Sequence, residues 1–197
     1  MEKPALNKYE IHPLIKRRWS PRSFEDRPVE KEKLQRLFEA ARWAPSSFNM
    51  QPWKFIIGFK GTKSYDKIMA SLVEFNQSWA KLAPVLAVVV GNKVNAKNKP
   101  NATFQYDTGQ SVAYLAIQAM HEGLFMHQMS GFDKSTAVKN FSIDDDHAPI
   151  AMFAIGYISS HEKLPENLQK MEKAERDRKD YNDFVFEEEF GRKSSLF

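Results

Sequence analysis

The chain has 197 residues, of which 42% are hydrophobic and 13% aromatic, enough for a single domain with a substantial core. It contains no cysteine, so disulfides, thiolate nucleophiles, thiolate metal sites and iron–sulfur clusters are excluded, and redox chemistry would need a bound cofactor. The net charge of +4 comes from 29 basic and 25 acidic residues mixed along the chain, and no motif indicates nucleic-acid binding.

Residues 1–13 are predicted to form a short N-terminal arm. The first ten residues are polar and lack the apolar segment of a signal peptide. No apolar run approaches the roughly 20 residues of a membrane helix. We therefore expect a cytoplasmic protein with no membrane partner.

A basic segment follows the end of a small helix predicted at 14–19. The pair Ser20–Pro21 breaks this helix, and Arg18, Ser20 and Arg22 then alternate in an extended stretch, so that all three side chains can point the same way. Two guanidinium groups and a hydroxyl suit a phosphate or an electron-rich ring edge. The basic triplet Lys16, Arg17 and Arg18 also suits the C-terminus of a helix, where cations complement the helix macrodipole.

A polar loop joins a helix to a strand near residue 50. One apolar stripe predicts an otherwise charged helix at 30–43, and Pro45 stops it. The aromatic and β-branched run 53–57 predicts a buried strand. Small hydroxyl and amide side chains lie between them: Ser46, Ser47, Asn49 and Gln51. They fit either a turn that satisfies its own backbone or a loop that binds a polar ligand.

The middle of the chain alternates helical and extended patterns. We expect a loop and helix at 60–73, a polar and aromatic connection at 74–81, and a central strand at 85–90 that is buried on both faces. The Lys- and Asn-rich residues 93–101 predict a solvated loop, either a plain surface loop or a lid.

The strongest helix is predicted at 105–122, and Gly123 would cap it. A strand at 124–129, a helix at 134–141 and a last core strand at 148–158 follow. Beyond residue 159 the chain is charged and interrupted by proline, which predicts a solvated linker, and apolar residues return between 181 and 190. Such a tail has little of its own core left to cover, so we expect it to pack on a neighbouring chain.

Four motifs, taken in their order along the chain, resemble those of the nitroreductase family of flavoproteins. The resemblance covers nearly the whole chain. The first is the basic segment 18–24, the second the loop and strand start 44–53 with its Ala-Pro-Ser-Ser-x-Asn-x-Gln-Pro-Trp pattern. The third joins Gly123–Leu124 to Met-Ser-Gly-Phe-Asp at 129–133, and the fourth is Ile-Gly-Tyr at 155–157.

This resemblance implies an α+β nitroreductase-like fold: a central mixed β-sheet flanked by helices, in one domain of residues 1–197. It also implies an intertwined homodimer in which helix 105–122 lies at the interface and the C-terminal extension 159–197 embraces the partner. FMN would bind between the two subunits.

By this resemblance, Arg18 and Ser20 would meet the FMN phosphate and ribityl chain, with the main chain of Trp19 between them. Arg22 would reach the N1/O2 edge of the flavin ring, where a cation stabilises the reduced anion. Arg192 and Lys193 would complete the phosphate site, and Lys81 could add a charge.

The resemblance places further residues around the ring. Asn76 would bind the pyrimidine edge, and a backbone N–H of Ser130 or Gly131 would point at N5 or O4. Two further residues would lie along the same side of the ring: Gln128 and Met129. Four residues would come from the opposite subunit: Pro45, Ser46, Ser47 and Asn49. Gln51 would support their loop.

Each of these residues also has a purely structural interpretation. Arg22 could form a surface ion pair, Asn76 could cap a helix, and Met129 could fill the core. Arg192 and Lys193 could belong to a basic terminus. The nearby His127 could serve in proton transfer, but packing is the commoner role of such a histidine.

The expected function is an FMN-dependent oxidoreductase that takes hydride from NADH or NADPH and reduces nitroaromatic, quinone or similar acceptors by a ping-pong mechanism. Flavin N5 would carry the chemistry, and no metal or catalytic side chain is expected. The alternatives are a flavin-binding sensor without turnover and another FMN enzyme of the same fold, of the dehalogenase or flavin destructase type. The sequence contains no Gly-x-Gly-x-x-Gly fingerprint, and it therefore does not distinguish NADH from NADPH as the electron donor.

Overall fold

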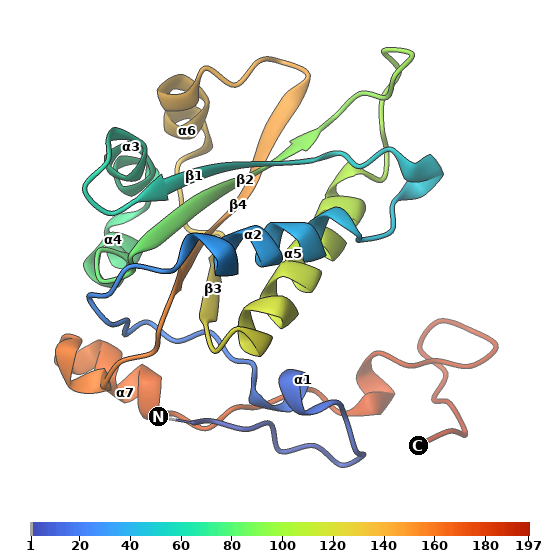
Figure 1. The fold of residues 1–197 in the computed structure, drawn as a ribbon. Coiled ribbons are helices and arrows are strands. Elements are labelled where there is room, and N and C mark those ends of the chain that lie inside the picture. The colour runs from blue at the N-terminus through green and yellow to red at the C-terminus, as the bar shows by residue number, and fades with distance from the viewer. Residues whose placement is uncertain (1) are drawn as a thin grey trace.

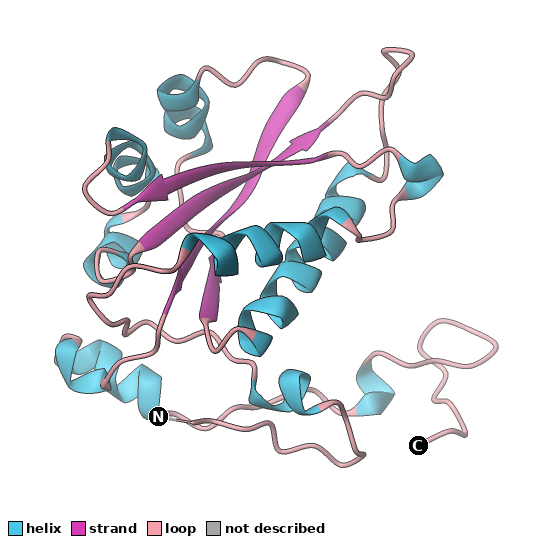
Figure 2. Cartoon of the chain, viewed as in Figure 1, coloured by secondary structure: helices cyan, strands magenta, loops and turns pink. Residues whose placement is uncertain are grey.

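A computed structural model describes residues 2–197 as a four-stranded sheet covered by helices on both faces (Figures 1 and 2). The strands are β1 (Trp53–Phe59), β2 (Val85–Asn92), β3 (Phe125–Met129) and β4 (His147–Gly156). The α-helices are α1 (Pro13–Arg17), α2 (Lys31–Arg42), α3 (Lys63–Ser71), α4 (Glu74–Ala80), α5 (Phe104–His121), α6 (Lys134–Phe141) and α7 (Glu166–Lys173). Short 3-10 helices are η1 (Ser47–Asn49), η2 (His161–Lys163) and η3 (Tyr181–Asp183).

The sheet has the strand order β1-β2-β4-β3, and its three ladders are antiparallel. The expected mixed sheet is therefore wrong for the described residues of one chain. The connection from β2 through α5 to β3 does give two strands of the same direction. Because β4 lies between them, however, they never pair with each other, and each strand has only antiparallel neighbours.

The two faces of the sheet carry separate cores. Along β2, Val85, Ala87 and Val89 pack with the helices α2 and α5, whereas the alternate residues Leu86 and Val88 pack with α3 and α4. This alternation follows from the two-residue period of a strand. It explains why β2 reads as a continuous apolar run, and it confirms the prediction of a strand that is buried on both faces.

Two segments predicted to be irregular are helical. Residues 74–80 form α4 rather than a connection, because Asn76 and Trp79 lie on one buried face while Glu74 occupies the first turn. Residues 166–173 form α7 rather than a solvated linker, because Leu168 and Glu172 face inward. Both helices are short, so little sequence periodicity was available to predict them.

The tail after α7 runs beside the N-terminal arm (Figure 1). The rings of Tyr181 and Phe197 stack at 4.2 Å, and Tyr9 lies edge-on to Tyr181 at 5.5 Å. Phe184 is 58% exposed and Phe190 97% exposed, so the tail leaves large apolar side chains uncovered in one chain. Within residues 2–197, no helix has both the length and the apolar character needed to cross a membrane.

Candidate functional site

The predicted basic segment lies between α1 and the core. Arg18 follows the last turn of α1, and its Nη1 donates to Ser20 Oγ at 3.4 Å. Trp19 is 6% exposed and packs edge-on against Phe125 of β3, with its ring centroid 6.4 Å away. Its buried indole N–H has no partner among residues 2–197. The alternation of the sequence therefore turns Trp19 into the core and leaves Arg18 and Ser20 together.

Uncompensated positive charge gathers at Arg18. Burial, followed by the nearby guanidinium groups of Arg176 and Arg178, lowers the pKa of Arg18. Arg176 donates to the backbone carbonyl of Arg18 at 2.9 Å, which fixes the tail against the basic segment. None of these three arginines forms an ion pair in the part of the chain that the structure describes. Such a site is suited to an anion.

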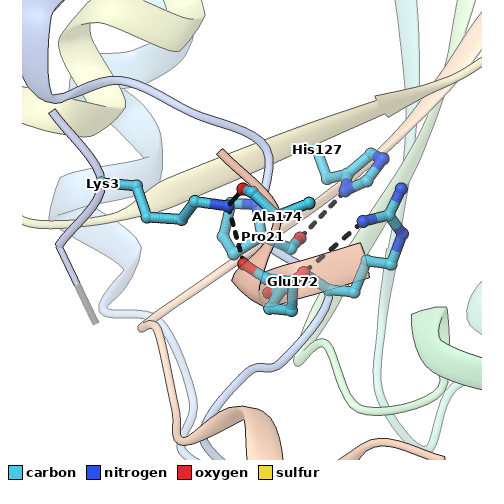
Figure 3. A network of polar contacts seen from close by, with 6 residues as sticks. Lys3, Pro21, His127, Glu172 and Ala174 are labelled. Atoms are coloured by element: carbon cyan, nitrogen blue, oxygen red, sulfur yellow. Dashed lines mark hydrogen bonds and ion pairs between the residues drawn. The ribbon is translucent and has the colours of Figure 1, made fainter. Parts of the chain in front are cut away.

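Arg22 binds Glu172 within the network of polar contacts that Figure 3 shows. Its backbone N–H donates to Glu172 Oε1 at 2.8 Å, and its Nη1 lies 3.5 Å from Glu172 Oε2. The side chains are 18% and 2% exposed, so this is an inward-facing ion pair rather than the surface pair considered above. The Nε–H of Arg22 is buried without a partner among the described residues.

His127 of β3 holds the same segment from the other side. Its Nδ1 lies 3.0 Å from the carbonyl oxygen of Pro21, so Nδ1 carries the proton. Its ring lies 4.4 Å from that of Trp79. Burial lowers the pKa of His127 to about 4. A neutral, packed imidazole fits the structural interpretation of this residue.

The end of β3 meets α4 at Gly131. The carbonyl oxygen of Gly131 accepts from Asn76 Nδ2 at 2.9 Å and from the backbone N–H of Val73 at 3.2 Å. A Cβ at Gly131 would lie 2.7 Å from Asn76 Nδ2. Met129 is buried in the core, whereas Gln128 and Ser130 are exposed. The backbone N–H groups of Ser130 and Gly131 have no acceptor within residues 2–197.

The polar loop predicted at residues 45–51 has an unusual backbone. Phe48, Asn49 and Gln51 have φ values of 48°, 54° and 46°, a region that residues other than glycine rarely adopt. Ser46 Oγ accepts from the backbone N–H of Gln51 at 3.0 Å, and the backbone N–H of Ser47 donates to Asp107 of α5 at 3.1 Å. Gln51 donates to the carbonyl of Asn49, as expected of a supporting residue.

One chain does not bring this loop to the basic segment. The loop lies at the N-terminal end of α5, whereas α1 and Arg18 lie toward its C-terminal end (Figure 1). An 18-residue helix spans about 27 Å. Pro45, Ser46, Ser47 and Asn49 therefore form a separate group from the residues of the basic segment and the end of β3.

The predicted cations of the tail also lie elsewhere. Arg192 and Lys193 are exposed, and Arg192 pairs with Glu188. Lys81, at the end of α4, is exposed as well. The tail residue that bonds to the basic segment is Arg176.

Sequence reasoning missed Glu172, Arg176 and Arg178. A signal for Glu172 was available, because Leu164, Leu168 and Glu172 recur every four residues and so share one helical face. A carboxylate on an apolar stripe needs a buried cation, and Arg22 supplies it. Arg176 and Arg178 lie in an irregular stretch whose position the sequence does not determine.

The comparisons with known proteins agree on one family. The nitroreductase family model matches residues 15–68. A Streptomyces coelicolor protein, named as a candidate NADH dehydrogenase/NAD(P)H nitroreductase, is 27% identical over 157 residues, which cover 68% of this chain and 76% of that protein.

Solved structures extend the likeness to the whole fold. A crystal structure described as an oxidoreductase containing FMN is 36% identical, covers 95% of this chain and 96% of its own, and has a TM-score of 0.89. A nitroreductase family protein from Clostridium difficile is 28% identical, covers 89% and 96%, and has a TM-score of 0.69.

Proposed function

The chain belongs to the nitroreductase family of oxidoreductases, and from that premise we propose that it uses FMN to transfer hydride from NADH or NADPH to an electron-poor acceptor. Nitroaromatic compounds and quinones are the acceptor classes that fit this chemistry. When bound, FMN would accept hydride at N5 and return it to the acceptor in a second half-reaction, which gives ping-pong kinetics. The side chains then have to bind, orient and shield the cofactor rather than act as nucleophiles.

The observation that carries the proposal is the unpaired positive charge at Arg18. A phosphate placed there would be held by Arg18 and Ser20, with Arg176 and Arg178 of the tail adding charge. Within one chain, we therefore assign the phosphate-binding role expected of Arg192 and Lys193 to Arg176 and Arg178, the tail cations beside Arg18.

The groups beside the phosphate site fit a flavin ring. Arg22 has a buried N–H without a partner, and the N–H groups of Ser130 and Gly131 are free to bind an acceptor. A Cβ at Gly131 would clash with Asn76, so glycine is what allows the end of β3 to approach α4 closely and to hold Asn76 beside these N–H groups. Because His127 of β3 bonds to Pro21, the basic segment and the end of β3 belong to one continuous region.

A homodimer would complete the site. On α5, Tyr106 is 73% exposed, and the small residues Gly109 and Ala113 continue its exposed face at helical spacing. Small residues allow two helices to approach closely. A partner packed on this face would bring its own Pro45, Ser46, Ser47 and Asn49 toward the flavin and so would join the two groups that one chain holds apart.

The first test is the absorbance spectrum of the purified protein, followed by addition of NADH or NADPH without air. We expect flavin bands at one FMN per chain that bleach with one of the two donors. A colourless protein that takes up no added FMN would contradict the proposal.

The binding residues have a separate test. The double variant Arg18→Ala/Arg22→Ala should lose FMN during purification, whereas Arg42→Ala, on the exposed side of α2, should retain it. Stoichiometric FMN in the double variant would contradict the assignment of the basic segment.

Two alternatives remain distinct from this proposal. A sensor would bind FMN but fail to reduce menadione in a steady-state assay with NADH or NADPH. A dehalogenase or flavin destructase of this fold would be expected to carry an inserted lid, and the link between β2 and α5 is only the short loop 93–103.

A further inference from the structure

The buried carboxylate of Glu172 contacts Arg22 and is not among the groups proposed to touch FMN. It comes from α7 in the C-terminal extension, and only 2% of its side chain is exposed. Both oxygens face Arg22: Oε1 accepts from the backbone N–H at 2.8 Å, and Oε2 lies 3.5 Å from Nη1 (Figure 3). A buried charge is costly unless it is paired, so the contact with Arg22 stabilises α7 in this position.

The peptide bond between Pro21 and Arg22 is fixed from two sides. His127 Nδ1 lies 3.0 Å from its carbonyl oxygen, and Glu172 binds its N–H group. Lys3 of the N-terminal arm secures α7 in turn, because its Nζ donates to the backbone carbonyls of Glu172, at 2.7 Å, and Ala174. Three other parts of the chain, β3, α7 and the N-terminal arm, thus determine the position of Arg22.

We propose that Glu172 is a positioning residue that aims Arg22 at the flavin and offsets part of its positive charge. This inference rests on the proposed function, because it requires FMN beside Arg22. A cation beside the ring favours the reduced anion, and a carboxylate on the far side of that cation opposes the effect. Glu172 would therefore hold the reduction potential of the bound flavin below the value that an unpaired Arg22 would give.

The test uses the FMN-loaded protein and the variant Glu172→Gln. The amide oxygen can still accept from the Arg22 N–H, but the negative charge is gone. At a fixed potential set by a reference dye, the ratio of reduced to oxidised flavin should rise about tenfold, the size expected for one charge acting across several ångströms of protein. Glu172→Asp keeps the charge and should leave this ratio near the wild-type value while weakening FMN binding.

Glu166→Gln is the matched control, because Glu166 lies on the same helix, is 83% exposed and pairs with the exposed Lys170. Its flavin ratio should equal that of the wild type. An unchanged ratio in FMN-loaded Glu172→Gln would overturn the proposal. If Glu172→Gln fails to fold, then an Glu172→Asp variant that binds FMN as tightly as the wild type would overturn it.

The two proposals fail in different ways. A wild-type protein that cannot be loaded with FMN would end the proposed function. A wild-type protein that binds FMN normally, with no change in ratio on Glu172→Gln, would remove only the role of Glu172.

Discussion

Gly131 shows how one missing side chain shapes the candidate site. A Cβ would lie 2.7 Å from Asn76 Nδ2 and 3.0 Å from Val73 Cγ2. In Gly131→Ala, Asn76 would have to move, and its 2.9 Å bond to the Gly131 carbonyl would be lost. We expect unfolding free energy to fall by about 1–3 kcal/mol, together with weaker FMN binding. Denaturant unfolding and a flavin fluorescence titration measure the two effects.

The control for this variant is Gly61→Ala. Gly61 has φ +86° with nothing within 4 Å of a built Cβ, so it tests backbone strain without steric contact. We expect a stability loss of about 1 kcal/mol and unchanged FMN affinity. Equal FMN affinity in both variants would show that the close contact between Gly131 and Asn76 does not contribute to FMN binding.

His127 makes stability depend on pH. Burial lowers its pKa from 6.5 to about 4, so the unfolded chain takes up a proton more readily than the folded one. The stabilisation is therefore complete above about pH 6.5 and is lost as pH falls toward 4, with a limit of roughly 3 kcal/mol. His127→Gln should flatten this part of the profile of unfolding free energy against pH, because an amide can still donate to Pro21 but does not titrate.

The comparison variant is His121→Gln, at the exposed end of α5. Its profile between pH 4 and 6.5 should keep the slope of the wild type. A wild-type slope in His127→Gln would assign the pH dependence to other groups.

Among the elements, the loop around η1 combines backbone strain with an exposed aromatic side chain. Phe48 has φ 48° and is 96% exposed, so contacts of its ring within residues 2–197 do little to offset the backbone strain. Phe48→Gly should raise the unfolding free energy by up to about 1 kcal/mol and raise the KM for the electron acceptor. Phe48→Ala keeps the strain but loses the ring, so it should raise KM without stabilising the chain. An unchanged KM in both variants would exclude a functional role for this ring.

The elements that the sequence predicted well are those with long, regular patterns. The stripe of α2, the apolar run of β2 and the capping Gly123 at φ 74° are local features, and the structure confirms them. The helices α4 and α7 were missed because each is defined by which face meets the core. Asn76 and Glu172 look polar in sequence but are buried, since Gly131 and Arg22 lie opposite them.

The same limit applies to the candidate site. Motifs predicted the basic segment and the end of β3, and the contact between His127 and Pro21 connects them. The approach of Arg176 to Arg18 depends on the path of an irregular tail, which has no local signature in sequence. The roles of Pro45, Ser46, Ser47 and Asn49 remain predictions, because they require a second chain.

For the whole molecule, the exposed face of α5 offers a direct test of the proposed dimer. Gly109→Trp would place a large ring between Tyr106 and Ala113, where the chain alone leaves open space. We expect the mass in solution, measured by light scattering, to fall from two chains to one, with loss of FMN. Lys139→Trp, on the exposed surface of α6, should stay dimeric and yellow. A Gly109→Trp protein that remains dimeric would exclude α5 from the interface.

The position of β4 in the sheet also sets the order in which the protein can fold. β2 ends at residue 92 and β3 at residue 129, yet both pair with β4, which begins at residue 147. During synthesis, the antiparallel pair of β1 and β2 therefore exposes an open edge of β2 until β4 has emerged. The central ladder closes a loop of more than fifty residues, which slows folding and leaves apolar strands open to aggregation. The nascent chain therefore stays exposed to aggregation through β2 until residues 147–156 have been synthesised and have paired with it.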